Sequence, residues 1–189
     1  ANPGWFMDEA LRELAFQKHT YGHTTIGYKR DVEAMPKNYA YSKTFFSRFY
    51  TPDNCTIWAV GDVDHKKVLE LVRGSYAGWK AKRAQPKIEV EPEQKEARQK
   101  ALTWKGPTTP RVTLGYKIPS AAENMRDVAA LAVTATLVFG EPGDLYQKVV
   151  VKDQKVIELG SDPDDTLNKD PGLFRVNEAG RTLLGISNS

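Results

Sequence analysis

The sequence contains little of what several classes of protein depend on. It has one cysteine, Cys55, among 189 residues, which excludes an internal disulfide framework and a thiolate metal cluster. No uninterrupted apolar run approaches the roughly 18 residues that cross a membrane, and the longest, 128–139, is broken by Thr134 and Thr136. We therefore expect no transmembrane segment.

An excess of charge of one sign is also missing. The chain has 27 lysines and arginines against 24 aspartates and glutamates, a net charge of +3, which is well short of a nucleic-acid-binding domain. The basic residues within 80–87 run directly into the glutamates within 89–93, so the sign alternates as in a solvated linker. We expect no nucleic-acid partner. A nucleic-acid or anion binder stays a third alternative, which a flat salt dependence of binding would exclude.

The residues that are present predict a globular α+β protein, since 40% are hydrophobic and 27% are charged. Apolar residues at helical spacing predict helices over 6–18, 36–50, 65–76, 127–139 and 144–152. Short β-type runs predict strands over 55–60, 101–104, 112–116, 155–159 and 173–177. Because several strands follow one another without an intervening helix, we expect an antiparallel-rich sheet and not a doubly wound parallel one.

Composition also divides the chain. Residues 79–100 are rich in Lys, Glu, Gln and Pro and almost lack large apolar residues, which is typical of a linker across the surface. We therefore expect one unit over 1–78, a linker over 79–100 and a second unit over 101–189. Neither a starting methionine nor a signal peptide is present. We interpret both ends as cuts through a longer protein.

Two histidines invite a metal-site interpretation. His19 and His23 are four residues apart, as two zinc ligands on one helical face would be. However, Gly22 lies between them, threonines follow, and no glutamate follows His19 to act as a base. A third ligand would have to come from elsewhere, such as Asp31 or Glu33. The favoured interpretation is that these histidines hold a loop by hydrogen bonds.

No other residue is set up for catalysis. Cys55 opens a predicted strand, where we expect it to be buried and unreactive. The Gly-x-Ser-x-Gly turn of serine hydrolases is missing. Asp162, Asp164 and Asp165 lack the glycine and closing glutamate of a calcium loop, so we interpret them as part of a polar loop. We accordingly assign no catalytic, cofactor-binding or metal-ligating residue.

Aromatic residues gather on the predicted helix 36–50. At helical spacing such a stripe is more often core than a ligand-stacking surface, so we expect it to be buried. The stripe consists of Tyr39, Tyr41, Phe45, Phe46, Phe49 and Tyr50. The apolar helix 127–139 is likewise expected to be largely buried.

Seven segments carry a family resemblance through their order along the chain. They are 19–27 (HTYGHTTIG), 45–54 (FFSRFYTPDN), 56–64 (TIWAVGDVD), 91–94 (EPEQ) with Arg98, 127–131, 144–146 and 170–174. In this order they resemble the M16 zinc peptidases, the family of insulinase, pitrilysin and mitochondrial processing peptidase. The strongest single match is 56–64.

The resemblance implies α+β modules, each an antiparallel-rich sheet with helices packed on one face. Residues 1–78 would end a first module, 79–100 would link, and 101–189 would begin a second. It implies zinc-dependent peptide hydrolysis for the parent protein, through a His-x-x-Glu-His motif and a distal glutamate. None of these ligands maps onto this chain, so we expect the fragment to bind no zinc and to be inactive. It would supply scaffold and part of the substrate-chamber wall.

A second interpretation is a fragment of a non-catalytic M16-like partner subunit that acts as a protein-interaction module. Residues 1–189 do not separate the two, although the loop 21–27 is closer to active bacterial members and favours the peptidase. The partners that the resemblance implies are a peptide or protein substrate, the remaining M16 modules, and a second subunit in a homodimer or heterodimer. It also implies a periplasmic or otherwise exported bacterial protein.

Overall fold

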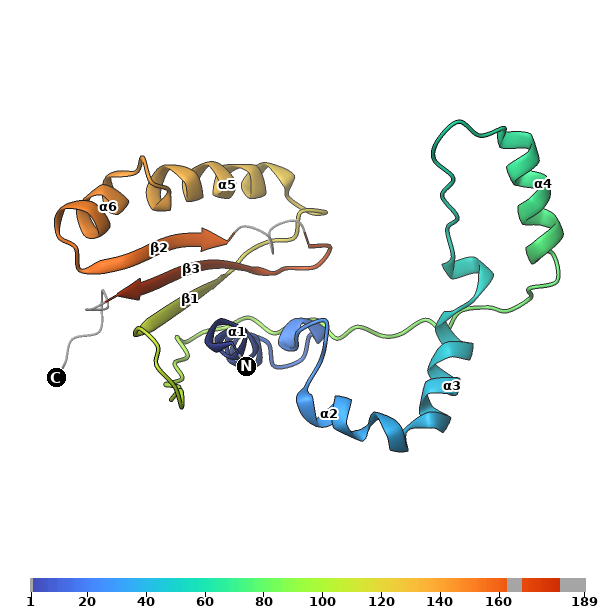
Figure 1. The fold of residues 1–189 in the computed structure, drawn as a ribbon, viewed down its shortest axis with the longest axis horizontal. Coiled ribbons are helices and arrows are strands. Elements are labelled where there is room, and N and C mark those ends of the chain that lie inside the picture. The colour runs from blue at the N-terminus through green and yellow to red at the C-terminus, as the bar shows by residue number, and fades with distance from the viewer. Residues whose placement is uncertain (1, 163–167, 181–189) are drawn as a thin grey trace. The chain divides into compact units, whose positions relative to one another are not determined.

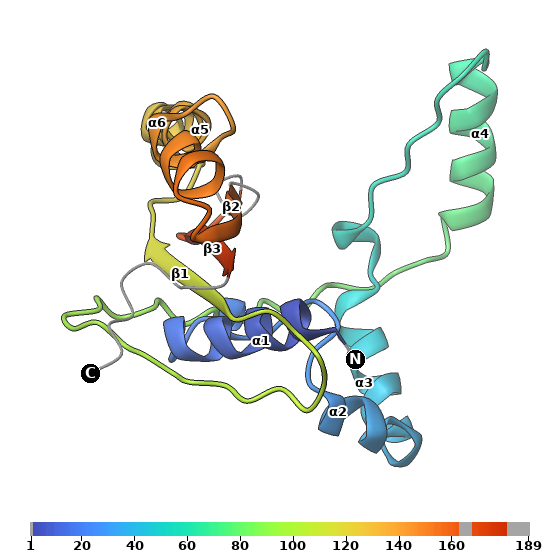
Figure 2. The same ribbon diagram turned by 60° about the vertical axis from the view of Figure 1, so that its left-hand side comes forward.

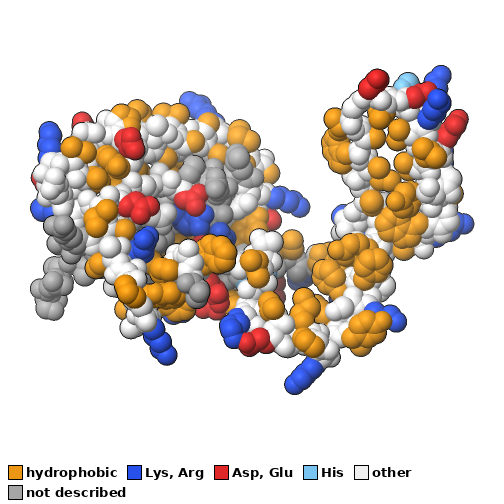
Figure 3. All heavy atoms as spheres, in the orientation of Figure 1, with side chains coloured by type: hydrophobic (Ala, Val, Ile, Leu, Met, Phe, Trp, Pro, Cys, Tyr) orange, Lys and Arg blue, Asp and Glu red, His pale blue; other side chains and the backbone are white. Residues whose placement is uncertain are grey.

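The chain forms two compact units in a computed structural model that describes residues 2–162 and 168–180 (Figure 1). Unit 1 comprises residues 1–25 and 89–189, and unit 2 comprises residues 26–88. Hydrophobic side chains are exposed on both units (Figure 3). The division into 1–78, 79–100 and 101–189 that composition suggests stays a prediction.

Unit 1 is built on an antiparallel sheet of three strands in the order β1-β3-β2. The strands are β1 (Arg111–Lys117), β2 (Val156–Asp162) and β3 (Leu173–Gly180). The register along β1 and β3 is continuous, whereas β2 carries an irregularity between Val156 and Glu158. The predicted antiparallel α+β fold is confirmed.

Helices lie on both sides of this sheet (Figure 2). On one side run α5 (Met125–Phe139), α6 (Asp144–Tyr146) and the π-helical turn Gln147–Lys152 that continues it. On the other side α1 (Pro3–Ala15) packs near β1, and the 3-10 turn Thr20–Gly22 follows it. The alternation of side chains along β3 allows it to contact both helical layers.

Helix caps explain where the two long helices of unit 1 begin. The Asn2 side chain accepts the N–H of Gly4 at 2.7 Å, and Pro3 supplies the backbone angle of a first helical residue. At α5 the side chain of Asn124 accepts the N–H of Asp127 at 3.2 Å. Each cap satisfies an N–H that the helix itself leaves without a partner.

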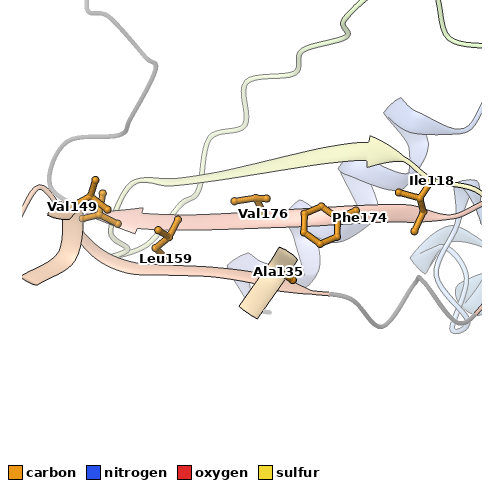
Figure 4. Packing of buried hydrophobic residues seen from close by; sticks show 7 residues of the cluster. Ile118, Ala135, Val149, Leu159, Phe174 and Val176 are labelled. Carbon is orange, nitrogen blue, oxygen red and sulfur yellow. The ribbon is translucent and has the colours of Figure 1, made fainter. Parts of the chain in front are cut away.

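The larger hydrophobic core lies between the sheet and the α5–α6 layer (Figure 4). β3 contributes Phe174 and Val176, β2 contributes Leu159, and the helical side contributes Ala135 and Val149. Phe174 and Val176 are two residues apart, so both point to the same face of the strand. Burial of this apolar surface is the main stabilising term of unit 1.

A smaller cluster lies on the opposite face of β3. Leu173, which is only 1% exposed, packs there with Ala15 and Phe16 at the end of α1. Leu11 and Tyr21 pack against this cluster from the side. β3 is therefore covered on both faces, and α1 is held to the sheet by apolar contacts at its C-terminal end.

The prediction that α5 is largely buried is wrong, because only Val128 and Ala135 of the helix are buried. By length and composition alone the segment Met125–Lys152 could cross a membrane. However, α5 ends at Phe139 after 15 residues, a rise of about 22 Å against the roughly 30 Å of a bilayer core. Its buried positions also face a sheet. The segment therefore has the character of a layer helix of a globular unit.

Unit 2 consists of helices and turns. It contains α2 (Lys29–Ala34), α3 (Tyr39–Phe49) and α4 (His65–Tyr76), with 3-10 turns at Met35–Lys37 and Pro52–Asn54. The predicted helices over 36–50 and 65–76 are confirmed. α2 was not predicted, since six residues are too few for an apolar period to show.

The predicted strands over 55–60 and 101–104 are wrong for the described structure. Both segments lack strand pairing, because β1, β2 and β3 pair only with one another among the described residues. Cys55 is exposed and not buried. β-type residues specify an extended chain, but a strand also needs a neighbour to accept its backbone hydrogen bonds.

Five of the six aromatic residues of the stripe are exposed and Phe49 is half-buried, contrary to the prediction that the stripe forms core. Its rings contact one another instead: Phe45 and Phe49 have centroids 4.8 Å apart, and Phe46 and Tyr50 are stacked at 4.5 Å. Within residues 26–88 only Thr51 is buried. Unit 2 therefore has no hydrophobic core of its own.

Candidate functional site: an anchored loop and a charged groove

The carboxylate of Glu91 holds the loop that follows α1. The backbone N–H groups of Gln17, Lys18 and His19 all donate to it, at 2.8 to 3.0 Å. These three amides follow the last residue of α1, Ala15, where the chain leaves the helix and turns. Such a run of N–H groups forms a concave site for an anion, which here is filled from within the chain.

The electrostatics of Glu91 follow from these contacts. Burial would raise the pKa of Glu91, but the N–H groups of His19, Gln17 and Lys18 and the charge of Lys117 together hold the pKa below its usual value. The Lys117 ammonium lies 3.7 Å from the Glu91 carboxylate. Glu91 is therefore ionised at neutral pH and serves as an anchor.

Lys117 is held between this carboxylate and an aromatic ring. Its Nζ lies 3.8 Å from the centroid of the Phe16 ring, a cation–π contact. Burial lowers the pKa of Lys117, and Glu91 partly opposes that shift by favouring the charged form. The last residue of β1 is thereby tied to the end of α1.

Arg98 completes the attachment from the other side of the helix end. Its guanidinium donates to the carbonyl oxygens of Leu14 at 2.8 Å and Ala15 at 3.4 Å. A cation at a helix C-terminus satisfies carbonyls that the helix leaves open and interacts favourably with its dipole. The two polar residues Glu91 and Arg98, both within 79–100, thus bind the amide and the carbonyl groups at one helix end.

The structure separates the two histidines. His19 is buried, its Nδ1 accepts the N–H of Tyr21 at 3.2 Å, and its Nε2 lies 3.7 Å from the Asp170 carboxylate. His23 is exposed, and its Nδ1 lies 2.9 Å from the Thr24 carbonyl oxygen. The interpretation that His19 holds a loop by hydrogen bonds is confirmed.

The other proposed zinc ligands have different partners. Asp31 lies beside Arg30, at 3.9 Å, and Glu33 pairs with Lys29 one turn earlier in α2. Among residues 2–162 and 168–180, no group of three or more His, Cys, Asp or Glu side chains is arranged to hold a metal ion. The donor set of the described chain therefore does not fit a zinc site.

A groove of about 480 Å³ lies between the N-terminal half of α1 and the sheet. Asp8 and Arg12 line it from α1, Arg111 from β1, and Arg175 and Asn177 from β3. These side chains give the groove both signs of charge together with an amide group. Such a lining can hold polar groups of an extended peptide by hydrogen bonds.

Arg175 organises the floor of this groove. Its guanidinium donates to Asp8 of α1 at 2.6 Å and to Asp162 of β2. Asp8 also pairs with Arg12 at 3.1 Å. A planar guanidinium suits two carboxylates at once, so one side chain of β3 links a helix to the neighbouring strand.

Asp162 is thus a partner of Arg175 at the end of β2 and not part of a loop. Asp164 and Asp165, which complete the acidic run of the sequence, lie outside the described residues. Sequence reasoning missed Arg175 as a functional residue. The available signal was a charged residue between Phe174 and Val176, because it must lie on the opposite face of the strand from the core.

These arrangements position elements and do not activate a nucleophile. Glu91 accepts backbone N–H groups, and Asp8 and Asp162 pair with Arg175. Cys55 lies exposed. Fold and site together define an α+β module that presents a polar groove.

Comparison with known proteins identifies the family. Residues 38–179 match the Peptidase M16 inactive domain. The chain therefore belongs to the M16 peptidase family, as the order of its segments predicts. The match spans most of the chain and includes the aromatic helix α3, the residues 79–100 and nearly all of the sheet.

Two matches from Helicobacter pylori illustrate the relationship. The zinc protease PqqE is 32% identical over 141 residues, which cover 73% of this chain and 31% of that protein. The crystal structure of a protease matches with a TM-score of 0.78 at 26% identity, over 94% of this chain and 42% of that one. The chain thus spans less than half the length of each relative.

Proposed function

We propose that this chain is the non-catalytic part of a zinc-dependent peptidase, in which it supplies scaffold and part of the substrate-chamber wall. The observation that carries the proposal is the match of residues 38–179 to the inactive domain of the M16 family. The name of the relative, a zinc protease, supports zinc-dependent peptide hydrolysis by the protein of which this chain would be part.

The chemistry of the described residues favours a structural role. A hydrolytic zinc site needs three protein ligands and an open position, and the described part of this chain offers no such group. The contribution of this chain is to hold structural elements in place. Glu91 and Arg98 fix the end of α1, while Arg175 fixes its middle to the sheet.

The groove supports the assignment as a chamber wall. It is bordered by a helix and a sheet that are tied together by the Arg175–Asp8 ion pair and by the apolar contacts at the end of α1, so its polar groups are held in place before a ligand arrives. Preorganised groups bind a peptide at a smaller cost in conformational entropy than mobile ones. We expect the groove to contact polar segments of a substrate in the complete enzyme.

The test compares three preparations for hydrolysis of a quenched fluorescent peptide with zinc present. The complete natural polypeptide that contains this sequence should hydrolyse the peptide and should lose activity to a chelator. The 189-residue chain should not hydrolyse it. A complete polypeptide from which residues 101–189 are deleted should be inactive; if it cleaves as fast as the intact protein, the chamber-wall proposal is wrong.

The same assay addresses the non-catalytic partner subunit. In that case the complete polypeptide is inactive alone but raises the activity of a separate M16 peptidase when the two are mixed. Hydrolysis by the purified 189-residue chain itself would contradict both assignments.

A further inference from the structure

His19 is a titratable side chain in the interior of unit 1 that the proposed function leaves without a role. The side chain is only 7% exposed. Its Nδ1 accepts the N–H of Tyr21 at 3.2 Å and thereby caps the 3-10 turn Thr20–Gly22. A backbone N–H can only donate, so Nδ1 carries no proton in this arrangement, and the neutral ring carries its proton on Nε2.

The protonated nitrogen of this neutral ring lacks a hydrogen bond. The Nε2 of His19 is buried and has no hydrogen-bond partner among residues 2–162 and 168–180. It lies 3.7 Å from the carboxylate of Asp170, which is too far for a hydrogen bond. The histidine and this carboxylate therefore form an incomplete pair, and the buried donor between them costs stability.

Asp170 belongs to the bend that leads into β3. The hydroxyl of Tyr21 accepts the N–H of Asp170 at 3.4 Å, so the 3-10 turn already contacts this bend beside the histidine. Leu173, which follows the bend, is 1% exposed and packs against Phe16. A movement of the histidine ring would therefore act on a contact close to the buried start of β3.

The other charged groups around the histidine already have partners. Glu91 accepts the backbone N–H of His19 and lies 3.7 Å from Lys117, and Arg98 donates to carbonyl oxygens at the end of α1. Asp170 is therefore the carboxylate placed to receive a charged ring. The charged and titratable groups on this side of unit 1 are Tyr21 in the turn, Glu91 and Arg98 within 79–100, Lys117 at the end of β1, and Asp170 before β3.

A second proton on the ring reverses the preference of both contacts. With Nδ1 protonated, the ring N–H and the N–H of Tyr21 would face each other, so the cap of the turn is lost. The ring then carries a positive charge beside the carboxylate of Asp170, which attracts it. Histidine is the side chain that ordinarily changes its charge between about pH 5 and 8.

We propose that His19 is an acid-sensitive switch, which caps the turn Thr20–Gly22 when it is neutral and binds Asp170 when it is doubly protonated. The second proton comes from solvent and adds to Nδ1, and no other group changes its charge. Acid thus opens the turn and strengthens the link to the bend before β3. The inference concerns unit 1 itself and does not depend on the proposed function.

The experiment is nuclear magnetic resonance of the complete natural polypeptide, with ¹⁵N-labelled histidine and tyrosine, from about pH 8 to 5. Ring nitrogen shifts report the tautomer and the charge of each histidine, and His19→Asn identifies the His19 signals. We expect the Nε2–H tautomer at the upper end of the range. As the ring becomes charged, exchange of the Tyr21 amide, corrected for the intrinsic rate at each pH, should become at least about tenfold faster.

Three results would overturn the proposal. The first is an Nδ1–H tautomer of His19 at the upper end of the range. The second is a ring that stays neutral throughout the range. The third is a Tyr21 amide whose corrected exchange rate does not change while the ring becomes charged.

Two variants separate the two contacts of the ring. Asp170→Asn removes the partner of the charged ring, so it should lower the midpoint of the His19 titration by at least about 0.5 pH unit and leave the neutral tautomer unchanged. H19N retains an acceptor in place of Nδ1 but does not titrate, so the corrected exchange of the Tyr21 amide should no longer respond to pH. The control is His23→Asn, at an exposed histidine, which should leave the response of Tyr21 as it is. An unchanged midpoint in D170N, or a full response of Tyr21 in H19N, contradicts the proposal.

Discussion

Glu91 offers the sharpest test of how unit 1 is held together, through the variant Glu91→Gln. The substitution keeps the shape of the side chain but replaces one accepting oxygen by an NH₂ group that faces N–H donors. It also removes the charge that Lys117 faces at 3.7 Å. The loop 17–19 then loses part of its anchor while the surrounding apolar cluster is unchanged.

The expected magnitude follows from the contacts. Hydrogen bonds to a charged group contribute about 1.5 to 3 kcal/mol each, and a buried donor left without a partner costs about 1 to 3 kcal/mol. The Glu91 side chain is 11% exposed, but Gln17 and Lys18 are exposed and their N–H groups can turn to water. We therefore expect E91Q to lower the free energy of unfolding of unit 1 by about 2 kcal/mol.

The assay is amide exchange of β3, because its protection reports the opening of unit 1 without a contribution from unit 2. A loss of 2 kcal/mol corresponds to exchange about 30-fold faster. The control is Glu89→Gln, an exposed glutamate two residues earlier, which should shift exchange by less than about twofold. Equal exchange in E91Q and the parent chain would refute the anchoring role.

The pH dependence gives a second, independent check. Because the pKa of Glu91 is lower in the folded chain than its usual 4.5, its stabilisation is fully present above that usual value. It is lost as the pH falls through the lowered pKa of the folded state. The stability difference between the parent chain and E91Q should therefore be constant near neutral pH and should close as the pH falls from 4.5 through the lowered pKa of Glu91 in the folded chain. A difference that persists in stronger acid contradicts the assignment.

Two further variants test the other attachments. Arg175→Met should destabilise unit 1 by about 2 to 3 kcal/mol because it leaves two carboxylates without their shared cation. Urea unfolding followed by β3 exchange measures this loss, with Arg126→Met on the exposed side of α5 as the control. Equal unfolding midpoints for the two variants would show that the Arg175 bridge is dispensable. Asp64→Ala should lower the stability of α4 by about 1 kcal/mol because it removes the cap of this helix. The expected result is faster amide exchange confined to the first turn of α4, and unchanged exchange there would contradict the prediction.

Local pattern was sufficient for most elements of the fold. The helices over 65–76 and 127–139 and the strands over 112–116, 155–159 and 173–177 follow from periods of 3.6 and 2, which the immediate neighbours decide. Asp64 as the cap of α4 was predictable for the same reason, since its carboxylate accepts the N–H of Lys66, two residues away, at 2.9 Å. The order of these elements was enough to predict an antiparallel sheet.

Burial was not predictable in the same way, because it depends on surfaces far apart in the chain. Cys55 and the aromatic stripe of α3 have the pattern of core residues, yet Cys55 and five residues of the stripe are exposed in the described structure. The strand over 55–60 failed for a related reason, since pairing needs a second segment.

The candidate site was beyond sequence reasoning because its contacts are long-range. Glu91 binds amides that precede it by 72 to 74 residues, and Arg175 bridges to Asp8 across 167 residues. The segment 91–94 with Arg98 is among the motifs that carry the family resemblance, but charge and composition alone do not distinguish Glu91 from Glu89 or Glu93. Only the fold brings the amides of the helix end to this one carboxylate.

The most direct test of the central claim is a calorimetric zinc titration of the purified 189-residue chain, with metal analysis of the same sample. We expect no stoichiometric zinc, because the described residues hold no group of ligands for it. One tightly bound zinc that is lost in His19→Ala or His23→Ala would contradict the account, since this chain would then carry a metal site of its own.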